Sequence, residues 1–312
     1  MRVLVLIVDY QSHKDAYRVA ATLAHPRSSH LVAIIDNGSL PALEKVPEGV
    51  RKIRLNENRG YAGGINEGLR ALGDEVKAFD LIWILNPDLT LDLKTLETLA
   101  QKFKTEPRLG AAGPRVLTPE GKVWGARGWV NPWLGLTGME DWTDPAPLPP
   151  HSYIPGCSLM VRRQAFSELG GLPDRYRLYY EETEFCLQLR NRGWQLRVVP
   201  EISVVHHVDS MKGRIPAAHY VFYFIRNNLY FWKNNFGIPA WVQFPRLLFV
   251  SVKEILIPLR RASDFKIVLS RIRLLAAALK DSFSFLQQRY TPNERIFFSI
   301  PDDQMIPIKE RV

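Results

Sequence analysis

Residues 81–88 read LIWILNPD, five apolar residues followed by a polar turn. An unbroken apolar run of this length is typical of a strand that is buried on both faces in a parallel sheet. Pro87 has no backbone N–H to donate, so we expect the strand to end before it. Asp88 would then lie at the carboxyl end of a central strand, where open α/β sheets bind their ligands. It could ligate Mg²⁺ or Mn²⁺ that bridges to substrate phosphates, or it could cap the helix expected to begin near Asp92.

Three further apolar stretches predict the rest of this sheet. They cover Val3–Val8, Leu31–Ile35 and Val50–Leu55. Their alternation with helical or loop segments indicates a doubly wound α/β domain. Asp9 and Asp36 directly follow the first two of these strands. Acids gathered at one edge of a sheet repel each other unless a cation or hydrogen-bond donors offset the repulsion, so we expect Asp9, Asp36 and Asp88 to share one site.

Residues 57–68 are rich in glycine, with four glycines between positions 60 and 68. Glycine permits positive φ and close approach of another group to the backbone. We expect a loop followed by a helix from about Gly68, and a helix N-terminus with Arg59 nearby suits a diphosphate. The spacing matches neither the dinucleotide-binding fingerprint nor a P-loop, so a plain glycine-rich turn is the alternative.

Two later segments contain further candidate residues. Residues 124–150 are rich in tryptophan and proline and predict a long irregular loop, either a lid that offers flat faces to a sugar or a segment packed on the core. Glu181, Glu182 and Glu184 lie at the start of a predicted helix, whose dipole favours carboxylates at that end. We expect Glu184 to lie on an exposed face of this helix. His206 ends a predicted strand near these carboxylates and is a candidate metal ligand.

Taken in order, these motifs resemble those of family 2 glycosyltransferases, particularly the bacterial rhamnosyltransferase-like branch. The matching pieces are Asp36–Ser39, Asn58–Gly64, Asn86–Asp88, Gly156–Arg163, Gly170–Pro173, Glu181–Leu187 and His206–His207. The resemblance implies a GT-A fold with a catalytic domain at residues 1–235. It also implies inverting transfer of a sugar from a nucleotide-diphosphate donor.

The resemblance further implies roles for individual residues. The expected donor-binding residues are Asp9, Asp36, Asn58, Arg59, Gly60, Gly63, Asn66 and Asn86. Mg²⁺ or Mn²⁺ would be held by Asp88 and His206, with His207 as the alternative to His206. The family's catalytic base lies in a Glu-Asp-x-Asp motif, which here reads EETE from position 181.

We expect Glu182 to be the base, with Glu181 as the alternative. Inversion requires a base on the acceptor's side of the sugar. It also requires stabilisation of the leaving diphosphate on the other side, which a metal ion supplies. Glu182 and Asp88 should therefore lie across one pocket from each other.

The formal charge of +9 is concentrated near the C-terminus. Residues 211–290 hold thirteen Lys or Arg and three acids, which leaves the rest of the chain at −1. No stretch here reaches the ~20 apolar residues needed to span a bilayer. We expect residues 236–312 to form amphipathic helices, one of them over residues 267–286, that bind an anionic membrane surface. Packing on the catalytic domain or a homo-oligomer contact is the alternative.

The sequence leaves the donor sugar open among rhamnose, galactofuranose and glucose, and the acceptor open between a lipid-linked molecule and a polysaccharide. Nucleic-acid binding by the basic tract is the competing function, but an aliphatic helical stripe suits lipid or protein better than stacked bases. Two cysteines are too few for a disulfide framework, and the first apolar run lacks a signal-peptide cleavage site. We therefore expect a cytoplasmic protein at the inner face of the cell membrane that builds a cell-surface glycan.

Overall fold

The computed structural model describes residues 1–24, 30–133, 135–207, 218–239, 241–245, 249 and 265–287. The chain divides into two compact units. The first consists of Met1–Arg177 and Glu181–Asp209, and the second consists of Leu178–Tyr180 and the described residues that follow Asp209. The predicted catalytic domain, residues 1–235, extends past this division, and its end at residue 235 stays a prediction.

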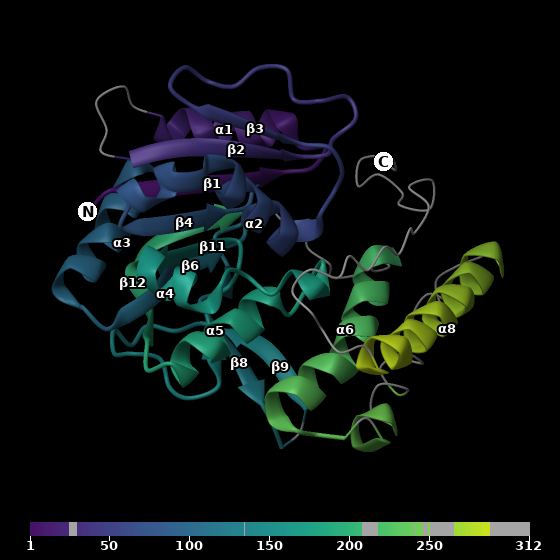
Figure 1. Cartoon of the computed structure of the whole chain (residues 1–312). Coiled ribbons are helices and arrows are strands. Elements are labelled where there is room, and N and C mark those ends of the chain that lie inside the picture. Colours follow the sequence, from purple (N-terminus) through teal and green to yellow (C-terminus); the bar gives the residue numbers. More distant parts are fainter. Residues whose placement is uncertain are drawn as a thin grey trace. The chain divides into compact units, whose positions relative to one another are not determined.

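A mixed sheet forms the centre of the first unit (Figure 1). Within the described residues its strands are β1 (Val3–Asp9), β2 (His30–Asn37), β3 (Arg51–Leu55), β4 (Leu81–Leu85), β5 (Leu89–Thr90), β6 (Leu109–Leu117), β7 (Val123–Gly125), β11 (Ser158–Arg162) and β12 (Gln195–His206). They lie in the order β3, β2, β1, β4, β11, β6, β12, β5, with β7 beside β6. The four strands from β3 to β4 run parallel, as predicted, whereas β11 runs antiparallel to β4. The sheet is therefore mixed, and the prediction of an all-parallel environment for β4 is wrong.

Helices cover both faces of this sheet. α1 (His13–Leu23) and α3 (Leu93–Thr105) share one buried cluster with Trp83 of β4. α2 (Gly60–Leu72) packs on the opposite face against Ile35. Every residue of β4 is buried, because covered faces on both sides leave no solvent-facing position for a polar residue.

The glycines of α2 serve close packing. α2 begins at Gly60, so the prediction of a loop that extends to Gly68 is wrong. A Cβ at Gly68 would stand 2.3 Å from Cδ1 of Ile35, and one at Gly64 would stand 3.2 Å from Cγ1 of Val8. The missing side chains let the helix approach the sheet closely, which a sequence pattern cannot distinguish from a phosphate-binding loop.

Residues 124–150, predicted as one irregular loop, instead contain most of a second sheet. β8 (Arg127–Asn131) pairs antiparallel with β9 (Leu136–Glu140) and with β10 (Ser152–Tyr153). The ring of Tyr153 lies over Gly128, where a Cβ would stand 2.1 Å from Cζ. In this sheet a glycine on one strand therefore faces an aromatic ring on the neighbouring strand. A segment built in this way is rich in glycine and aromatic residues, and its composition resembles that of a loop.

Four further helices belong to the described part of the first unit, and one of them confirms the helix predicted to have Glu181 at its start. They are α4 (Arg163–Leu169), α5 (Glu181–Asn191) and the short helices η1 (Gly73–Ala78) and η2 (Asp174–Tyr176). Gly170 follows α4 with φ 75° and Gly193 follows α5 with φ 84°. Glycine ends a helix in this left-handed conformation without steric cost.

Two helices form the described core of the second unit. α6 (Ala218–Phe236) and α8 (Phe265–Gln287) lie side by side and share a buried apolar cluster (Figure 1). Nε of Arg226 lies 3.3 Å from Oδ2 of Asp281, and both residues are buried. α8 confirms the helix that apolar spacing predicts over residues 267–286.

Asn227 of α6 holds the short segment that precedes α5. Its Nδ2 donates to the carbonyl oxygens of Leu178, at 2.8 Å, and Tyr179, at 3.2 Å. Tyr179 and Tyr180 have φ values of 68° and 77°. A non-glycine residue in this region costs about 1–3 kcal/mol, so the hydrogen bonds from Asn227 stabilise a strained backbone.

No helix within the described residues is long and apolar enough to cross a membrane. Most of residues 236–264 and all residues after 287 lie outside the described residues, as do several basic residues of the 211–290 tract.

Candidate active site

Asp88 follows the end of β4 and faces His206, the last residue of β12. Oδ1 of Asp88 lies 3.1 Å from Nε2 of His206. Burial by itself would raise the pKa of Asp88, but the imidazole outweighs burial and the net pKa is lowered. The N-terminus of α3 is capped by Asp92, whose Oδ1 accepts from the N–H of Thr95 at 2.8 Å. Asp88 is therefore not the helix cap, and its carboxylate is ionised and directed at a histidine.

The structure also separates His206 from His207. Nε2 of His207 lies 2.7 Å from Oγ1 of Thr90, so only His206 faces the carboxylate of Asp88 among the described histidines. Nδ2 of Asn86 lies 3.4 Å from Nε2 of His206. Of the two histidines that the sequence leaves open as metal ligands, His206 is the one that faces Asp88, and its role as a ligand stays a prediction.

Asp88 and His206 fit a divalent cation. A carboxylate oxygen suits Mg²⁺ and Mn²⁺, and two adjacent ligands of an octahedral ion with bonds of about 2.1 Å stand about 3.0 Å apart. The observed separation of Oδ1 and Nε2 is 3.1 Å. The described residues contain no group of three His, Cys, Asp or Glu that could hold a metal by themselves. Mg²⁺ commonly takes one or two protein ligands and completes its shell with phosphate oxygens and water.

The first turn of α5 carries three glutamates in different environments, and Glu184 is the structural one. It is fully buried, and Nε2 of Gln188 donates to its Oε1 at 2.8 Å. Arg175 and Tyr176 are its further partners. The prediction that Glu184 lies on an exposed face is wrong, because η2 supplies a cation and a hydroxyl that offset the burial of its charge.

Glu181 and Glu182 have environments that favour proton transfer. Glu181 is 3% exposed, and its Oε2 has no hydrogen-bond partner among the described residues. Burial, and then the charge of Glu182, raise the pKa of Glu181 well above its ordinary value. Glu182 is half-buried, and burial raises its pKa as well. A carboxylate with a raised pKa is a stronger base, and Glu182 retains the accessible surface that a substrate needs.

The turn at Gly156 and Cys157 adjoins both groups. The N–H of Asn86 donates to the carbonyl oxygen of Cys157 at 2.9 Å. A Cβ at Gly156 would stand 3.3 Å from Cγ of Glu182. Burial raises the pKa of the Cys157 thiol, and the nearby charges of Asp88 and Glu182 raise it further. The structure therefore brings the predicted metal side and the predicted base to one turn.

Tyr61 is a member of this cluster that sequence reasoning missed. Its hydroxyl donates to the carbonyl oxygen of Gly156 at 2.6 Å. Burial raises the pKa of Tyr61 well above its ordinary value, and Cys157 and the neighbouring carboxylates raise it further. The available signal was its place as the single aromatic residue in the glycine-rich segment 57–68.

Asp9 and Asp36 form a second centre at the ends of β1 and β2, where they are direct neighbours. Oδ1 of Asp9 accepts from the N–H and the hydroxyl of Ser12, at 2.9 and 2.8 Å, and its Oδ2 contacts Nδ1 of His13. No hydrogen bond or ion pair in the described part of the chain joins Asp9 or Asp36 to Asp88. The three acids follow the carboxyl ends of the adjacent parallel strands β2, β1 and β4, as expected, and a ligand site shared by all three stays a prediction.

Asp36 is fully buried and its charge is offset locally. Its carboxylate accepts from the N–H groups of Ser39, at 3.0 Å, and Leu43, at 2.8 Å, and it contacts Arg54. Burial by itself would raise the pKa of Asp36, but these donors outweigh burial and lower it. Asp36 therefore holds the 37–43 loop in place, and a direct contact with the donor stays a prediction.

Asn37, which was also not predicted as a site residue, holds the turn before α2 in place. Its Oδ1 accepts from the N–H of Arg59 and its Nδ2 donates to the carbonyl oxygen of Gly60, both at 2.9 Å. Oδ1 of Asn58 accepts from the N–H of Gly60 at 2.8 Å. The guanidinium of Arg59 pairs with Glu57 at 2.9 Å. This network presents Arg59 at the start of α2.

Two further predicted donor-binding residues make structural contacts. Nδ2 of Asn66 donates to the carbonyl oxygen of Leu172 at 2.8 Å, and its Oδ1 accepts from the N–H of Leu172 at 3.0 Å. A Cβ at Gly63 would stand 3.0 Å from Cβ of Arg59. Asn66 therefore links α2 to the turn after α4, and Gly63 leaves room for Arg59.

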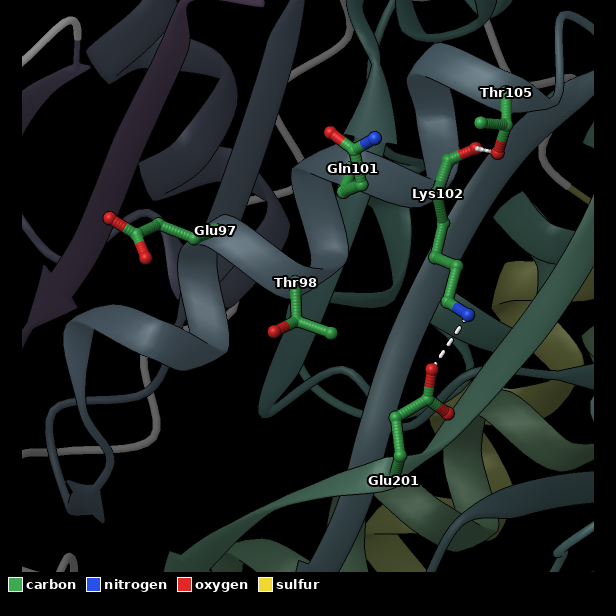
Figure 2. Close-up of a pocket in the computed structure, with 6 residues that line it drawn as sticks. All are labelled: Glu97, Thr98, Gln101, Lys102, Thr105 and Glu201. Carbon is green, nitrogen blue, oxygen red and sulfur yellow. Dashed lines mark hydrogen bonds and ion pairs between the residues drawn. The ribbon is translucent and has the colours of Figure 1, made fainter.

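An open hollow of about 530 Å³ lies elsewhere on the first unit (Figure 2). It is lined by Glu97, Thr98, Gln101, Lys102, Thr105 and Glu201. Figure 2 shows the ion pair between Lys102 and Glu201, in which Nζ lies 2.6 Å from Oε1. None of the predicted site residues lines this hollow, so we interpret it as a solvated face of α3 and β12.

Comparisons with known proteins identify related glycosyltransferases. A family model described as glycosyl transferase family 2 matches residues 17–170. The chain is 29% identical over 235 residues to the N-acetylglucosaminyl-diphospho-decaprenol L-rhamnosyltransferase of Mycobacterium tuberculosis, over 66% of this chain and 76% of that protein. It is 25% identical over 239 residues to the low-salt glycan biosynthesis hexosyltransferase Agl10 of Haloferax volcanii, over 72% of this chain and 73% of that protein.

The fold is similar to that of the mannosyltransferase PcManGT from Pyrobaculum calidifontis, solved in complex with GDP-Man and Mn²⁺. The TM-score is 0.53 with 13% sequence identity, over 93% of this chain and 88% of that chain. At this identity the likeness concerns the fold alone. It supports the predicted GT-A-like α/β fold followed by C-terminal helices.

Proposed function

Because this chain belongs to glycosyl transferase family 2, it is a nucleotide-sugar glycosyltransferase of glycan synthesis, and we propose that it transfers the sugar with inversion and with a divalent metal ion. The observation that carries this proposal is the turn at Gly156 and Cys157. It adjoins the pair Asp88 and His206 and also Glu182. A single displacement needs an acceptor-side base and a cation at the leaving group.

Glu182 is the base in this proposal. It takes the proton of the acceptor hydroxyl while that oxygen forms a bond to the anomeric carbon. The bond from the anomeric carbon to the diphosphate breaks in the same step, and its electron pair leaves with the diphosphate. Asp88 and His206 would hold Mg²⁺ or Mn²⁺, which stabilises the charge of the leaving diphosphate. As in inverting glycosidases, no covalent sugar–enzyme intermediate is required.

The donor's nucleotide end would lie at the second centre. Asp9 and Asp36 hold the loops that follow β1 and β2. Arg59, at the start of α2, would exchange its contact with Glu57 for a diphosphate oxygen, because charge-assisted bonds to phosphate are strong. The predicted donor contacts of Asn58, Gly60, Gly63, Asn66 and Asn86 are part of this proposal.

The similarity to an L-rhamnosyltransferase supports rhamnose as the first sugar to test. The same relative's name supports a lipid-diphosphate-linked acceptor. Galactofuranosyl and glucosyl transfer, and a polysaccharide acceptor, are the alternatives that a donor and acceptor panel would separate.

The test is turnover of a panel of nucleotide sugars with Mg²⁺, with Mn²⁺ and with chelator. We expect one donor to react, chelator to stop the reaction, and Asp88→Ala and Glu182→Gln each to lower kcat about 100-fold or more. Glu97→Gln, the same chemical change on an exposed helix position, is the matched control and should retain full activity. NMR of the product's anomeric configuration tests inversion. A reaction that is indifferent to chelator would contradict the metal role.

Contact with an anionic membrane surface is the second part of the proposal. On α8, Leu269 and Ile272 are 37% and 45% exposed, and Arg273 and Lys280 are exposed between apolar positions. The one acid of α8, Asp281, is buried. An apolar and basic helix face suits anionic lipid headgroups, which supports a location at the inner face of the cell membrane.

The membrane contact is tested by co-sedimentation with vesicles. Binding should require anionic lipid and should fall in the double variant Arg273→Glu and Lys280→Glu. Equal binding to zwitterionic vesicles would contradict the lipid interpretation. Displacement of the protein from anionic vesicles by an oligonucleotide would contradict it as well. Sedimentation velocity without lipid tests the homo-oligomer alternative.

A further inference from the structure

We propose that Tyr61 is a positioning residue that ties the start of α2 to the turn at Gly156 and Cys157 and thereby holds Glu182 in place. This inference rests on the proposed function, in which Glu182 is the base. Its central observation is the 2.6 Å hydrogen bond from the hydroxyl of Tyr61 to the carbonyl oxygen of Gly156. The two residues are 95 positions apart in the sequence, so the bond joins two segments that local structure does not connect.

The backbone of Tyr61 is held by a hydrogen bond of its own. Its N–H donates to the carbonyl oxygen of Arg177 at 2.9 Å. Gly60 precedes it with φ 74°, and a Cβ there would stand 2.3 Å from the same oxygen. Only glycine combines this φ with this approach. The first helical turn of α2 is therefore held in place at its backbone, and the side chain of Tyr61 extends from it to Gly156.

The other end of the tie is anchored as well. The N–H of Asn86 donates to the carbonyl oxygen of Cys157 at 2.9 Å, and Ser158 pairs with Leu85 where β11 meets β4. The turn is thus joined to the strand end that carries Asp88. Tyr61 adds a connection from the opposite side, so the turn is held between the proposed donor-binding segment and the proposed metal side.

The side chain of Glu182 lies directly on this turn. A Cβ built on Gly156 would stand 3.3 Å from Cγ, 3.4 Å from Cβ and 3.5 Å from Cδ of Glu182. These distances leave no room for a side chain at Gly156 unless Glu182 moves by a few tenths of an ångström. A shift of the turn therefore changes the position of the carboxylate.

Tyr61 acts as a hydrogen-bond donor in this arrangement. Burial and the nearby Cys157, Glu181 and Glu182 raise the pKa of its phenol, so the hydroxyl stays protonated and neutral. A neutral phenol can bond the carbonyl of Gly156 without adding charge beside the base. Phenylalanine would preserve the ring and remove only this bond.

The experiment compares Tyr61→Phe with Tyr153→Phe in the full chain. Tyr153 is the matched control, because its hydroxyl also donates to a glycine carbonyl, that of Gly138 at 3.3 Å, but in the second sheet. We expect Tyr61→Phe to lower kcat about 10- to 100-fold, the range for misplacement of a reacting group by a fraction of an ångström. The donor KM should stay within about twofold, because no donor contact is removed. Tyr153→Phe should leave both constants unchanged.

Gly156→Ala supplies a second perturbation of the same element from the side of Glu182. It should also lower kcat at nearly constant donor KM. Since both substitutions displace one carboxylate, the double variant Tyr61→Phe with Gly156→Ala should lose less than the product of the two single losses. Thermal unfolding of each variant separates loss of fold from loss of position.

The outcomes distinguish this inference from the proposed function. If the wild-type chain turns over a donor and Tyr61→Phe retains kcat within about twofold, the positioning role is overturned and the transferase proposal stands. A fall in kcat that Tyr153→Phe matches, or a double variant that loses the full product, also overturns it. If the wild-type chain turns over no donor of the panel, with acceptor and anionic vesicles present, both proposals fall together.

Discussion

Glu182→Gln and Glu184→Gln are the same chemical change two residues apart on one helix, and we expect them to shift stability in opposite directions. Glu184 is fully buried and paired with Arg175. Glu182 is half-buried, and burial raises its pKa. The carboxylate of Glu184 is therefore stabilised by a cation, whereas burial destabilises the charged form of Glu182.

The size of the Glu184→Gln effect follows from the buried pair. Removing one partner of a buried ion pair costs about 3–5 kcal/mol, and Glu184 is the fully buried partner here. With a urea m value of about 2–3 kcal/mol per molar, the unfolding midpoint should fall by about 1–2.5 M. That loss is a large fraction of the roughly 5–15 kcal/mol by which domains are stable.

The sign for Glu182→Gln is the reverse. A carboxyl whose folded pKa lies above its unfolded value stabilises the fold most below the unfolded pKa of about 4.5, and that stability is lost as the pH rises through the folded pKa. At neutral pH the ionised Glu182 therefore costs stability. Glutamine removes this cost, so the midpoint should equal or exceed that of the wild type while kcat falls about 100-fold or more.

Urea unfolding by circular dichroism at neutral pH, with donor turnover measured on the same samples, decides the matter. Glu184→Gln should be destabilised yet retain activity per folded molecule, whereas Glu182→Gln should be stable and inactive. Destabilisation by Glu182→Gln together with an unchanged midpoint for Glu184→Gln would refute the assignment of structural and catalytic roles on α5.

Three further predictions concern the scaffold. Gly68→Ala places a Cβ 2.3 Å from Cδ1 of Ile35, so overpacking of about 1–3 kcal/mol should exceed the helix-propensity gain of about 1 kcal/mol and lower the thermal midpoint. Burial alone would lower the pKa of His13, but Pro41 and Asp9 outweigh it and raise the pKa. The loss of stability caused by His13→Ala, measured from urea midpoints, should therefore be largest below about pH 6.5 and should shrink as the pH rises through the folded pKa. Asn227→Ala removes both bonds to the strained 178–180 segment and should speed amide hydrogen exchange there, and unchanged exchange would contradict that anchoring role.

The central strands and several helix ends are predictable because their signals are local. Five consecutive apolar residues in β4 match a strand covered on both faces. Asp92 precedes α3 and caps it, and Gly193 follows α5 with a positive φ. Each of these features depends on a few adjacent residues, so pattern reasoning finds them.

Other elements depend on what a residue meets across the fold. Gly64 reads as part of a loop and Gly68 as the start of a helix, but both lie inside α2, where Val8 and Ile35 leave no room for a side chain. Glu184 reads as an exposed acid at a helix start, but Arg175 and Tyr176 bury and bond it. A local pattern contains no information on such neighbours.

The sequence by itself determined the family resemblance, the alternation of strands and helices, and the residue types expected at the site, since these depend on composition and short-range spacing. Only the tertiary structure decided which residues meet. Asp88 and His206 are 118 positions apart and are joined by the pairing of β5 with β12, and Tyr61 reaches Gly156 across 95 positions. The physical reason is that strand register and helix packing, which arise from burial of the whole core, set distances between side chains that no local preference constrains.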